Sequence, residues 1–380
     1  MGINLFVPKF RTQEILKEIE VCLEKGWTGL GFKTVEFEEK WKEYSGLPCA
    51  HFLSSNTAGL HLALNILREE RGWKEADEVI TTPLTFVSTN HAILYERLTP
   101  VFADVDDYLC LDPRSVESRI TPRTRAVMFV GMGGNAGQLE AVIGLCRERG
   151  LALILDAAHM AGTRLVGEHV GRHVDAAVFS FQAVKNLPTG DSGMICFADP
   201  ARDRLARKKS WLGISKDTYE RFATPDATYR WRYDVESVGF KYHGNSLMAA
   251  VALAQLRYLE EDNTRRRELS SLYDSLLPQV PAVTPVRTAP RCVSSRHLYQ
   301  VCVPRRDDVV EFLHRRGISP GVHYVDNTTY PMYRSGDGTC PVARRKSDTL
   351  LSLPLHLNLS DGDARTVVEV LAEAVRALPA

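Results

Sequence analysis

The chain has 380 residues, with 47 Lys and Arg against 47 Asp and Glu, so its formal net charge is zero. This balance argues against partners such as nucleic acid or an anionic membrane, since both are bound by concentrated positive charge. The length is enough for one large domain and a smaller one.

Several features of the sequence indicate a protein of the cytoplasm. No apolar stretch approaches the roughly 20 residues that cross a bilayer. The N-terminus lacks a basic segment followed by an apolar run, and Phe6 is unfavourable for a myristoylation signal. The eight cysteines form no Cys-x-x-Cys pair and have no histidine at metal-ligand spacing. We therefore expect reduced thiols, no metal site and a soluble chain.

Helical and strand patterns alternate through the first 200 residues, which favours an α/β fold with a mostly parallel central sheet flanked by helices. A helix is expected over 58–70, where Leu60, Leu64 and Leu67 share one face, and another over 139–149. The expected strands are 78–82, 100–104, 126–130, 151–155 and 176–181.

The last third of the chain predicts a smaller α/β domain. A helix with a cap at Asn245 or Ser246 precedes it, so we divide the chain into a large domain, 1–250, and a small C-terminal domain, 251–380. In the small domain we expect a solvated helix surface over 260–268, strands at 298–303 and 321–324, and a closing helix over 361–377.

Lys185 is the most informative residue of the sequence. It follows the apolar strand 176–181 and begins a glycine-rich turn, whereas most lysines are solvated surface charges. About 30 residues upstream, Asp156 directly follows a second apolar strand, where a carboxylate is poorly solvated and needs a cationic partner. A lysine that forms a Schiff base and a carboxylate that pairs with a pyridinium nitrogen are what a pyridoxal phosphate enzyme requires.

Other residues fit the same cofactor, although each has an ordinary structural interpretation. Thr57 and Ala58 open a helix whose amides suit a phosphate, but such a start is also a common cap. Ser180 could supply a further phosphate hydrogen bond. Phe86 follows a strand and could stack on a pyridine or belong to the core, and His159 could bond the phenolic oxygen of the ring or be a satisfied polar residue.

Together these residues resemble the DegT/StrS family of nucleotide-sugar aminotransferases, which have the fold type I of aspartate aminotransferase. The order and spacing of several blocks carry the resemblance over nearly the whole chain. The blocks are residues 26–29, 57–64 and 100–106, the sequence Asp156-Ala157-Ala158-His159, Phe179-Ser180-Phe181 with Lys185, and residues 351–356.

The resemblance implies specific roles for these residues. Lys185 is then the Schiff-base lysine of pyridoxal 5'-phosphate and Asp156 the partner of its ring nitrogen, with pyridoxamine 5'-phosphate as the intermediate form. It places Thr57, Ala58 and Ser180 at the phosphate, Phe86 over the ring and His159 beside it. It also places Thr28, His323 and Tyr324 near the substrate.

The resemblance further implies a homodimer with shared active sites. In the family, an Asn from a Gly-Tyr/Phe-Asn-Tyr motif reaches the partner's phosphate, but this chain reads Gly239-Phe240-Lys241-Tyr242. Lys241 therefore stands at the Asn position, and either Lys241 or Asn245 is the candidate for this contact. A second departure is Gly190-Asp191-Ser192-Gly193 in place of the family's Gly-Glu-Gly-Gly.

The expected activity is transfer of an amino group, with glutamate as the donor, to a keto sugar on a nucleotide diphosphate, at C4 of a 4-keto-6-deoxyhexose. Arg230, Arg232, Lys241 and His243 are candidates for the donor carboxylates. A keto-cyclitol is the alternative acceptor. A dehydratase branch, in which histidine replaces the lysine, conflicts with Lys185. A non-catalytic regulator that binds the cofactor is disfavoured because both Lys185 and Asp156 are present.

Overall fold

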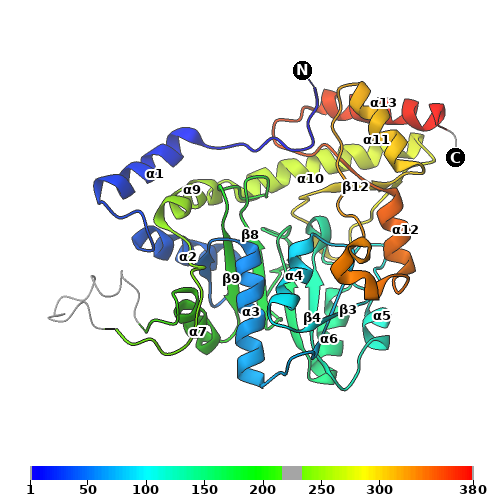
Figure 1. Cartoon of the computed structure of the whole chain (residues 1–380). Coiled ribbons are helices and arrows are strands. Elements are labelled where there is room, and N and C mark those ends of the chain that lie inside the picture. The colour runs from blue at the N-terminus through cyan, green and yellow to red at the C-terminus, as the bar shows by residue number, and fades with distance from the viewer. Residues whose placement is uncertain (1, 216–232, 379–380) are drawn as a thin grey trace.

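The computed structural model describes residues 2–215 and 233–378 of the chain. Its centre is a seven-stranded sheet in the order β1-β9-β8-β5-β4-β2-β3 (Figure 1). The strands are β1 (His51–Leu53), β2 (Glu78–Thr81), β3 (Thr99–Phe102), β4 (Thr124–Val130), β5 (Ala152–Asp156), β8 (Ala176–Ser180) and β9 (Gly193–Phe197).

The sheet is parallel except for β9, which runs antiparallel to both of its neighbours, β1 and β8. Strands β2, β4, β5, β8 and β9 are almost wholly buried, which explains why most of their residues are apolar. The mostly parallel α/β architecture predicted from the sequence is confirmed, and each strand expected in the first 200 residues lies within two residues of its predicted ends. The carboxyl ends of β1, β2, β4, β5 and β8 meet at one edge, where ligands collect in such sheets.

Helices cover the central sheet and connect its strands. The predicted helix after β1 spans Asn56–Arg71, and the one before β5 begins and ends where the sequence indicated. The helices of this part are α1 (Thr12–Glu24), α2 (Phe32–Ser45), α3 (Asn56–Arg71), α4 (Val87–Tyr95), α5 (Pro113–Ser118), α6 (Leu139–Arg149), α7 (Pro200–Ser210) and α9 (Ser246–Leu256).

The C-terminal part has its own apolar core. A three-stranded sheet in the order β10-β12-β13 packs with helices that follow α9, and Val301, Leu313, Leu353 and Leu371 are among the residues that it buries. These elements are β10 (Thr284–Pro285), β12 (Tyr299–Cys302), β13 (Leu350–Leu353), α10 (Leu259–Leu276), α11 (Arg306–Arg315), α12 (Pro341–Thr349) and α13 (Asp361–Ala377). The division at residue 250 remains a proposal.

The N-terminal segment reaches this C-terminal part. Ile3 forms a parallel bridge with Ile318, and Figure 1 shows the N-terminus beside α11 and α13. The segment then runs along α10 and α9 toward α1 (Figure 1), where Gln255 donates to the Lys9 carbonyl and Arg11 pairs with Asp262. A small third sheet joins β6 (Arg164–Leu165), β7 (Glu168–His169) and β11 (Cys292–Val293).

Two local predictions are wrong. Residues 321–324 form no strand, because only Gly321 bridges to β13, at Ser352, while His323 and Tyr324 turn toward a cavity. The charged stretch 260–268 is not simply a solvated surface, since Asp262, Asn263 and Arg266 are buried on the inner face of α10. Because acidic and basic residues alternate along this part of α10, the sequence pattern did not indicate which residues pack against the rest of the chain.

Gly193 allows the start of α3 to lie directly against β9. A Cβ atom at this position would come within 2.6 Å of the backbone nitrogen of Asn56 and the backbone carbon of Ser55. Contacts this short do not occur, so any side chain here would displace the first turn of α3. The missing side chain of Gly193 therefore sets the position of a helix N-terminus at the carboxyl edge of the sheet.

The remaining sequence expectations concern cysteines and membranes. All eight cysteines are free thiols, six of them buried. Among the residues that the structure describes, no helix is long and apolar enough to cross a membrane.

Candidate active site

A cavity of about 470 Å³ lies at the carboxyl edge of the central sheet. Side chains that follow β1, β2, β4, β5 and β8 line one side of it, and the N-terminal segment and the C-terminal part supply Phe6, His297, His323 and Tyr324. The predicted site residues that line this one cavity are Thr57, Phe86, Asp156, His159, Ser180, Lys185, His323 and Tyr324.

Asp156 ends β5 and is only 4% exposed. Its Oδ1 accepts hydrogen bonds from Asn56 Nδ2 at 3.3 Å and from the amide of Ala158 at 3.1 Å, and its Oδ2 accepts from the Thr89 hydroxyl at 2.8 Å. Burial raises the pKa of Asp156, and these three donors together with the charge of Lys185 oppose the rise. No cation lies within ion-pair distance of Asp156 among the described residues, so the carboxylate suits a protonated ring nitrogen.

Lys185 lies in the loop that joins the antiparallel strands β8 and β9. Backbone hydrogen bonds from Phe181 to Ser192 and from Ala183 to Gly190 close this loop, and the Lys185 amide turns back to the Gln182 carbonyl at 2.8 Å. The side chain enters the cavity, where burial lowers the pKa of Lys185 to about 8 while the Asp156 charge opposes the shift. The amine is thus available as a nucleophile at a far lower pH than an exposed lysine.

The donors expected for a phosphate lie at the start of α3 and the end of β8. Ser55 caps α3 by accepting the Ala58 amide at 3.1 Å, so the amide of Ala58 is occupied and Ala58 does not line the cavity. In the described chain the Thr57 amide and the hydroxyl protons of Thr57 and Ser180 have no acceptor. Free donors at a helix N-terminus match the needs of a phosphate dianion.

Three histidines make the opposite wall uncharged. Burial lowers the pKa of His159 and of His297 well below the usual value, and that of His323 to about 4. His159 Nδ1 accepts the Gly133 amide at 3.2 Å, so the ring proton is on Nε2 and is directed at the Tyr324 hydroxyl, 3.2 Å away. Phe86 stands at the mouth, 57% exposed, with its ring 5.8 Å from that of Tyr324.

The other predicted residues lie outside this cavity in the single chain. Thr28 is exposed and its carbonyl accepts the Ser246 amide. Lys241 Nζ lies 3.2 Å above the ring of Trp211, and Asn245 caps α9 through the Met248 amide. His243 bonds its neighbour's carbonyl, whereas Arg230 and Arg232 lie outside the described residues.

Sequence reasoning missed Phe6, Asn56, Thr89 and His297. Asn56 and Thr89 donate hydrogen bonds to Asp156, and His297 lies within hydrogen-bond distance of the Lys185 amine. A polar residue directly after the cap of α3 was the only available signal for Asn56. Phe6 and His297 had none, because they come from distant segments of the chain.

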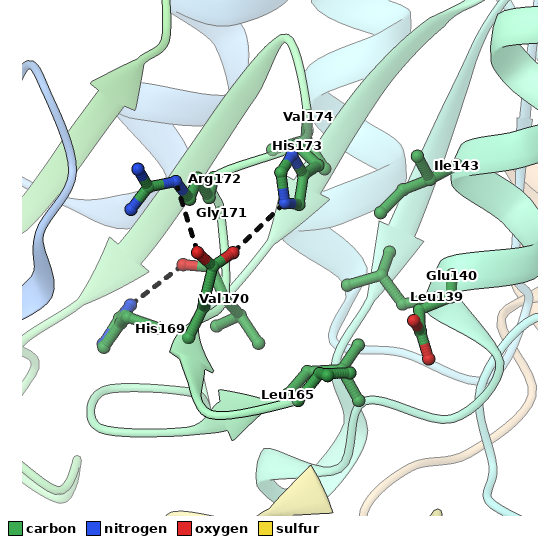
Figure 2. A pocket seen from close by; sticks show the side chains of 12 residues that line it. Leu139, Glu140, Ile143, Leu165, His169, Val170, Gly171, Arg172, His173 and Val174 are labelled. Carbon is green, nitrogen blue, oxygen red and sulfur yellow. Dashed lines mark hydrogen bonds and ion pairs between the residues drawn. The ribbon is translucent and has the colours of Figure 1, made fainter. Parts of the chain in front are cut away.

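A second cavity, of about 310 Å³, lies between α6 and the β6–β7 hairpin (Figure 2). It shares no lining residue with the first cavity. Its ionisable side chains have partners: Glu168 contacts Arg172 at 3.6 Å and His173 at 3.2 Å, and Glu140 pairs with Arg291, which does not line the cavity. Of the two cavities, only the one at the sheet edge combines an amine, a carboxylate and free donors.

This fold and this set of side chains define a pyridoxal-phosphate enzyme of fold type I. The chain belongs to the DegT/DnrJ/EryC1/StrS aminotransferase family, whose pattern matches residues 10–372. It is therefore an aminotransferase that depends on pyridoxal phosphate, and several solved structures that it resembles are named as sugar aminotransferases.

Three relatives illustrate the similarity. The dTDP-4-dehydro-2,3,6-trideoxy-D-glucose 4-aminotransferase of Saccharopolyspora spinosa is 36% identical over 382 residues, covering 98% of this chain and 97% of that one. The crystal structure of the aminotransferase TlmJ from Streptoalloteichus hindustanus matches with a TM-score of 0.91 at 32% identity over the full length of both chains. The PMP-form of the putative sugar aminotransferase Spr1654 from Streptococcus pneumoniae matches with a TM-score of 0.91 at 25% identity, covering 98% and 99%.

Replacing Asp156 by Asn tests the role of the buried carboxylate. The variant should fold, because an amide oxygen still accepts from Asn56 and Ala158, but it should lose about 10²–10⁴ in the rate of amino transfer, the scale of one electrostatic element. A neutral amide does not keep the ring nitrogen protonated. Stopped-flow absorbance of the half-reaction with an amino acid measures this rate, and the unfolding midpoint is the control. A near-normal rate in a folded variant would contradict the assignment.

Proposed function

We propose that the enzyme transfers an amino group from glutamate to C4 of a 4-keto-6-deoxyhexose that is linked to a nucleotide diphosphate. The observation that carries the proposal is the near full-length match to the Saccharopolyspora spinosa enzyme, whose name specifies 4-amination of a dTDP-linked 4-keto sugar. The cavity supports it, since about 470 Å³ is space for a hexose beside a cofactor but not for a whole nucleotide sugar. The nucleotide would then lie outside the mouth, past Phe86.

The residues of the cavity divide the work between binding and proton transfer. Pyridoxal phosphate, when bound, supplies the electron sink that stabilises negative charge on the carbon next to the transferred nitrogen. Asp156 would hold a proton at the ring nitrogen, and Thr57 and Ser180 would bind the phosphate. Lys185 would bind the cofactor and, when released, carry the proton between carbon and cofactor, for which an amine with a pKa of about 8 is suited.

His323 and Tyr324 are the substrate-facing candidates that this chain places in the cavity, and Thr28 is proposed to act from a neighbouring subunit. No arginine among the described residues lines the cavity. The carboxylates of the proposed donor therefore need cations from elsewhere, and Arg230, Arg232, Lys241 and His243 remain the candidates.

We propose a homodimer in which Lys241 and Asn245 of one subunit complete the cavity of the other. Both residues lie outside the cavity of their own chain, although Lys241 carries a charge and the Asn245 amide nitrogen has no acceptor among the described residues. The segment before Lys241 exposes the apolar side chains of Val235 and Val238, the latter 87% exposed, beside the exposed charged residues Asp234 and Glu236. Exposed apolar side chains support the proposal of a subunit interface here.

Mixing two inactive variants tests the shared site. Lys185→Ala removes the catalytic amine, and the double variant Lys241→Ala/Asn245→Asp removes the proposed phosphate donors while an aspartate keeps the α9 cap. Mixed dimers should regain activity, because one of their two sites has both halves intact. Tagged pull-down shows that subunits exchange. Confirmed mixed dimers that stay inactive, or a fully active monomer in sedimentation, would contradict the shared site.

A substrate panel tests the proposed reaction. Nucleotide-linked 4-keto and 3-keto hexoses and a keto-cyclitol are incubated with glutamate and the holoenzyme, and products are identified by mass spectrometry and NMR. We expect a 4-amino sugar nucleotide together with 2-oxoglutarate. Lys185→Ala serves as the control for non-enzymatic amination. Turnover of the cyclitol alone, or of the 3-keto sugar alone, would contradict the proposal.

A further inference from the structure

The amine of Lys185 has one hydrogen-bond partner among the described residues, His297 Nε2, at 3.5 Å. His297 precedes β12 in the C-terminal part, 112 residues further along the chain. The contact therefore joins the loop between β8 and β9 to a segment that the central sheet does not position. Its geometry depends on how the His297 ring is held.

The His297 ring is fixed on both faces. It is 1% exposed, the Phe6 ring stacks on it with the centroids 5.6 Å apart and the planes within 7°, and the His159 ring lies 4.4 Å away. The backbone amide of His297 also donates to the Gly133 carbonyl at 3.1 Å. A ring packed in this way directs Nε2 at the Lys185 amine without freedom to turn aside.

A chain of amides fixes which ring nitrogen of His297 carries the proton. Asn263 donates its Nδ2 to the Ala161 carbonyl at 2.9 Å, so its Oδ1 must be the acceptor for Asn186 Nδ2, at 2.7 Å. Asn186 Nδ2 also donates to the Ser295 carbonyl at 2.7 Å, which leaves Asn186 Oδ1 facing His297 Nδ1 at 3.0 Å. An amide oxygen only accepts, so Nδ1 holds the proton and Nε2 presents its lone pair to Lys185.

We infer that His297 is a positioning residue that holds the free Lys185 amine with its Nε2 lone pair, and that the Asn263–Asn186 chain exists to keep this tautomer. The inference rests on the proposed function in one respect: the Lys185 amine is free whenever the cofactor carries the transferred amino group. During that half of the cycle the flexible Lys185 side chain would otherwise turn away from the cavity. A lone pair at 3.5 Å favours an amine or ammonium directed at His297 over one that leaves the site.

Other charged and titratable groups face this pair and are unchanged in the test. They are Asp156, His159, Asp191, Arg266, His323 and Tyr324. Only Asp156 acts on Lys185 with an opposite charge, and it does so without a hydrogen bond. A change at position 297 therefore alters the acceptor of the amine without altering its counter-charge.

Two substitutions separate the contact to Lys185 from the contact to Asn186. His297→Gln keeps an acceptor oxygen near the position of Nε2 and loses the donor to Asn186. His297→Asn keeps a donor near the position of Nδ1 and loses the acceptor for Lys185. His169→Gln is the control: His169 lines the second cavity, is equally buried, and bonds the Val170 carbonyl rather than any lysine (Figure 2).

The readout is the reactivity of Lys185 in the cofactor-free protein, measured by competitive acetylation with a trace of acetic anhydride as the pH is varied, followed by peptide mass spectrometry. The wild-type midpoint is expected near pH 8. In His297→Asn it should fall by about 0.5–1 pH unit, because a long charge-assisted hydrogen bond no longer stabilises the ammonium. The midpoints of His297→Gln and His169→Gln should stay at the wild-type value.

Equal midpoints in the wild type and His297→Asn, or the same fall in His169→Gln, would overturn the inference. If His297 had only a structural role, His297→Asn, which keeps the contact with Asn186, would destabilise the fold less than His297→Gln. Long-range ¹H–¹⁵N NMR of ¹⁵N-histidine protein, with the signal assigned by its loss in His297→Gln, should show a protonated Nδ1, and a protonated Nε2 would refute the tautomer. None of these measurements needs turnover, so they test the inference even if the substrate panel contradicts the proposed reaction.

Discussion

The site depends on taking one amine and one carboxylate out of water in the same cavity. Burial lowers the pKa of Lys185 to about 8 and raises that of Asp156, so burial disfavours the charged form of both groups in the cofactor-free chain. A bound pyridine ring would relieve both penalties, since it consumes the amine and supplies a cation for the carboxylate. The folded chain thus bears the free-energy cost of burying these two ionisable groups, and binding of the cofactor would offset it, as is common for preorganised sites.

The surrounding wall keeps this arrangement from being neutralised. His159, His297 and His323 are all held uncharged by burial, so none of them competes with the cofactor for Asp156 or repels the amine of Lys185. The donors to Asp156 are two amides and a hydroxyl, which satisfy the carboxylate without cancelling its charge. Polar but uncharged neighbours therefore hold a reactive pair that charged ones would neutralise.

The sequence was sufficient to predict five of the seven strands of the central sheet and several residues at its edge, whereas β1 and β9 were not predicted. Asp156 and Ser180 end apolar strands and Lys185 lies in the loop after one of them, and parallel strands bring their carboxyl ends together whatever the details of packing. Contacts between distant segments were not predictable in this way. Asn56 reaches Asp156 across 100 residues and His297 reaches Lys185 across 112, and no local pattern encodes either pairing. The false strand at 321–324 has the same cause, because only Gly321 finds a partner strand while His323 and Tyr324 are drawn into the cavity.

The central claim is that Lys185, and no other lysine, binds the cofactor, and covalent trapping tests it most directly. The purified protein loaded with pyridoxal phosphate is reduced with borohydride, digested and mapped by mass spectrometry. The account predicts one phosphopyridoxyl group, on the peptide that contains Lys185, and none on the Lys185→Ala variant. A stable adduct on a different lysine, or no adduct in a protein that holds the cofactor, would contradict it.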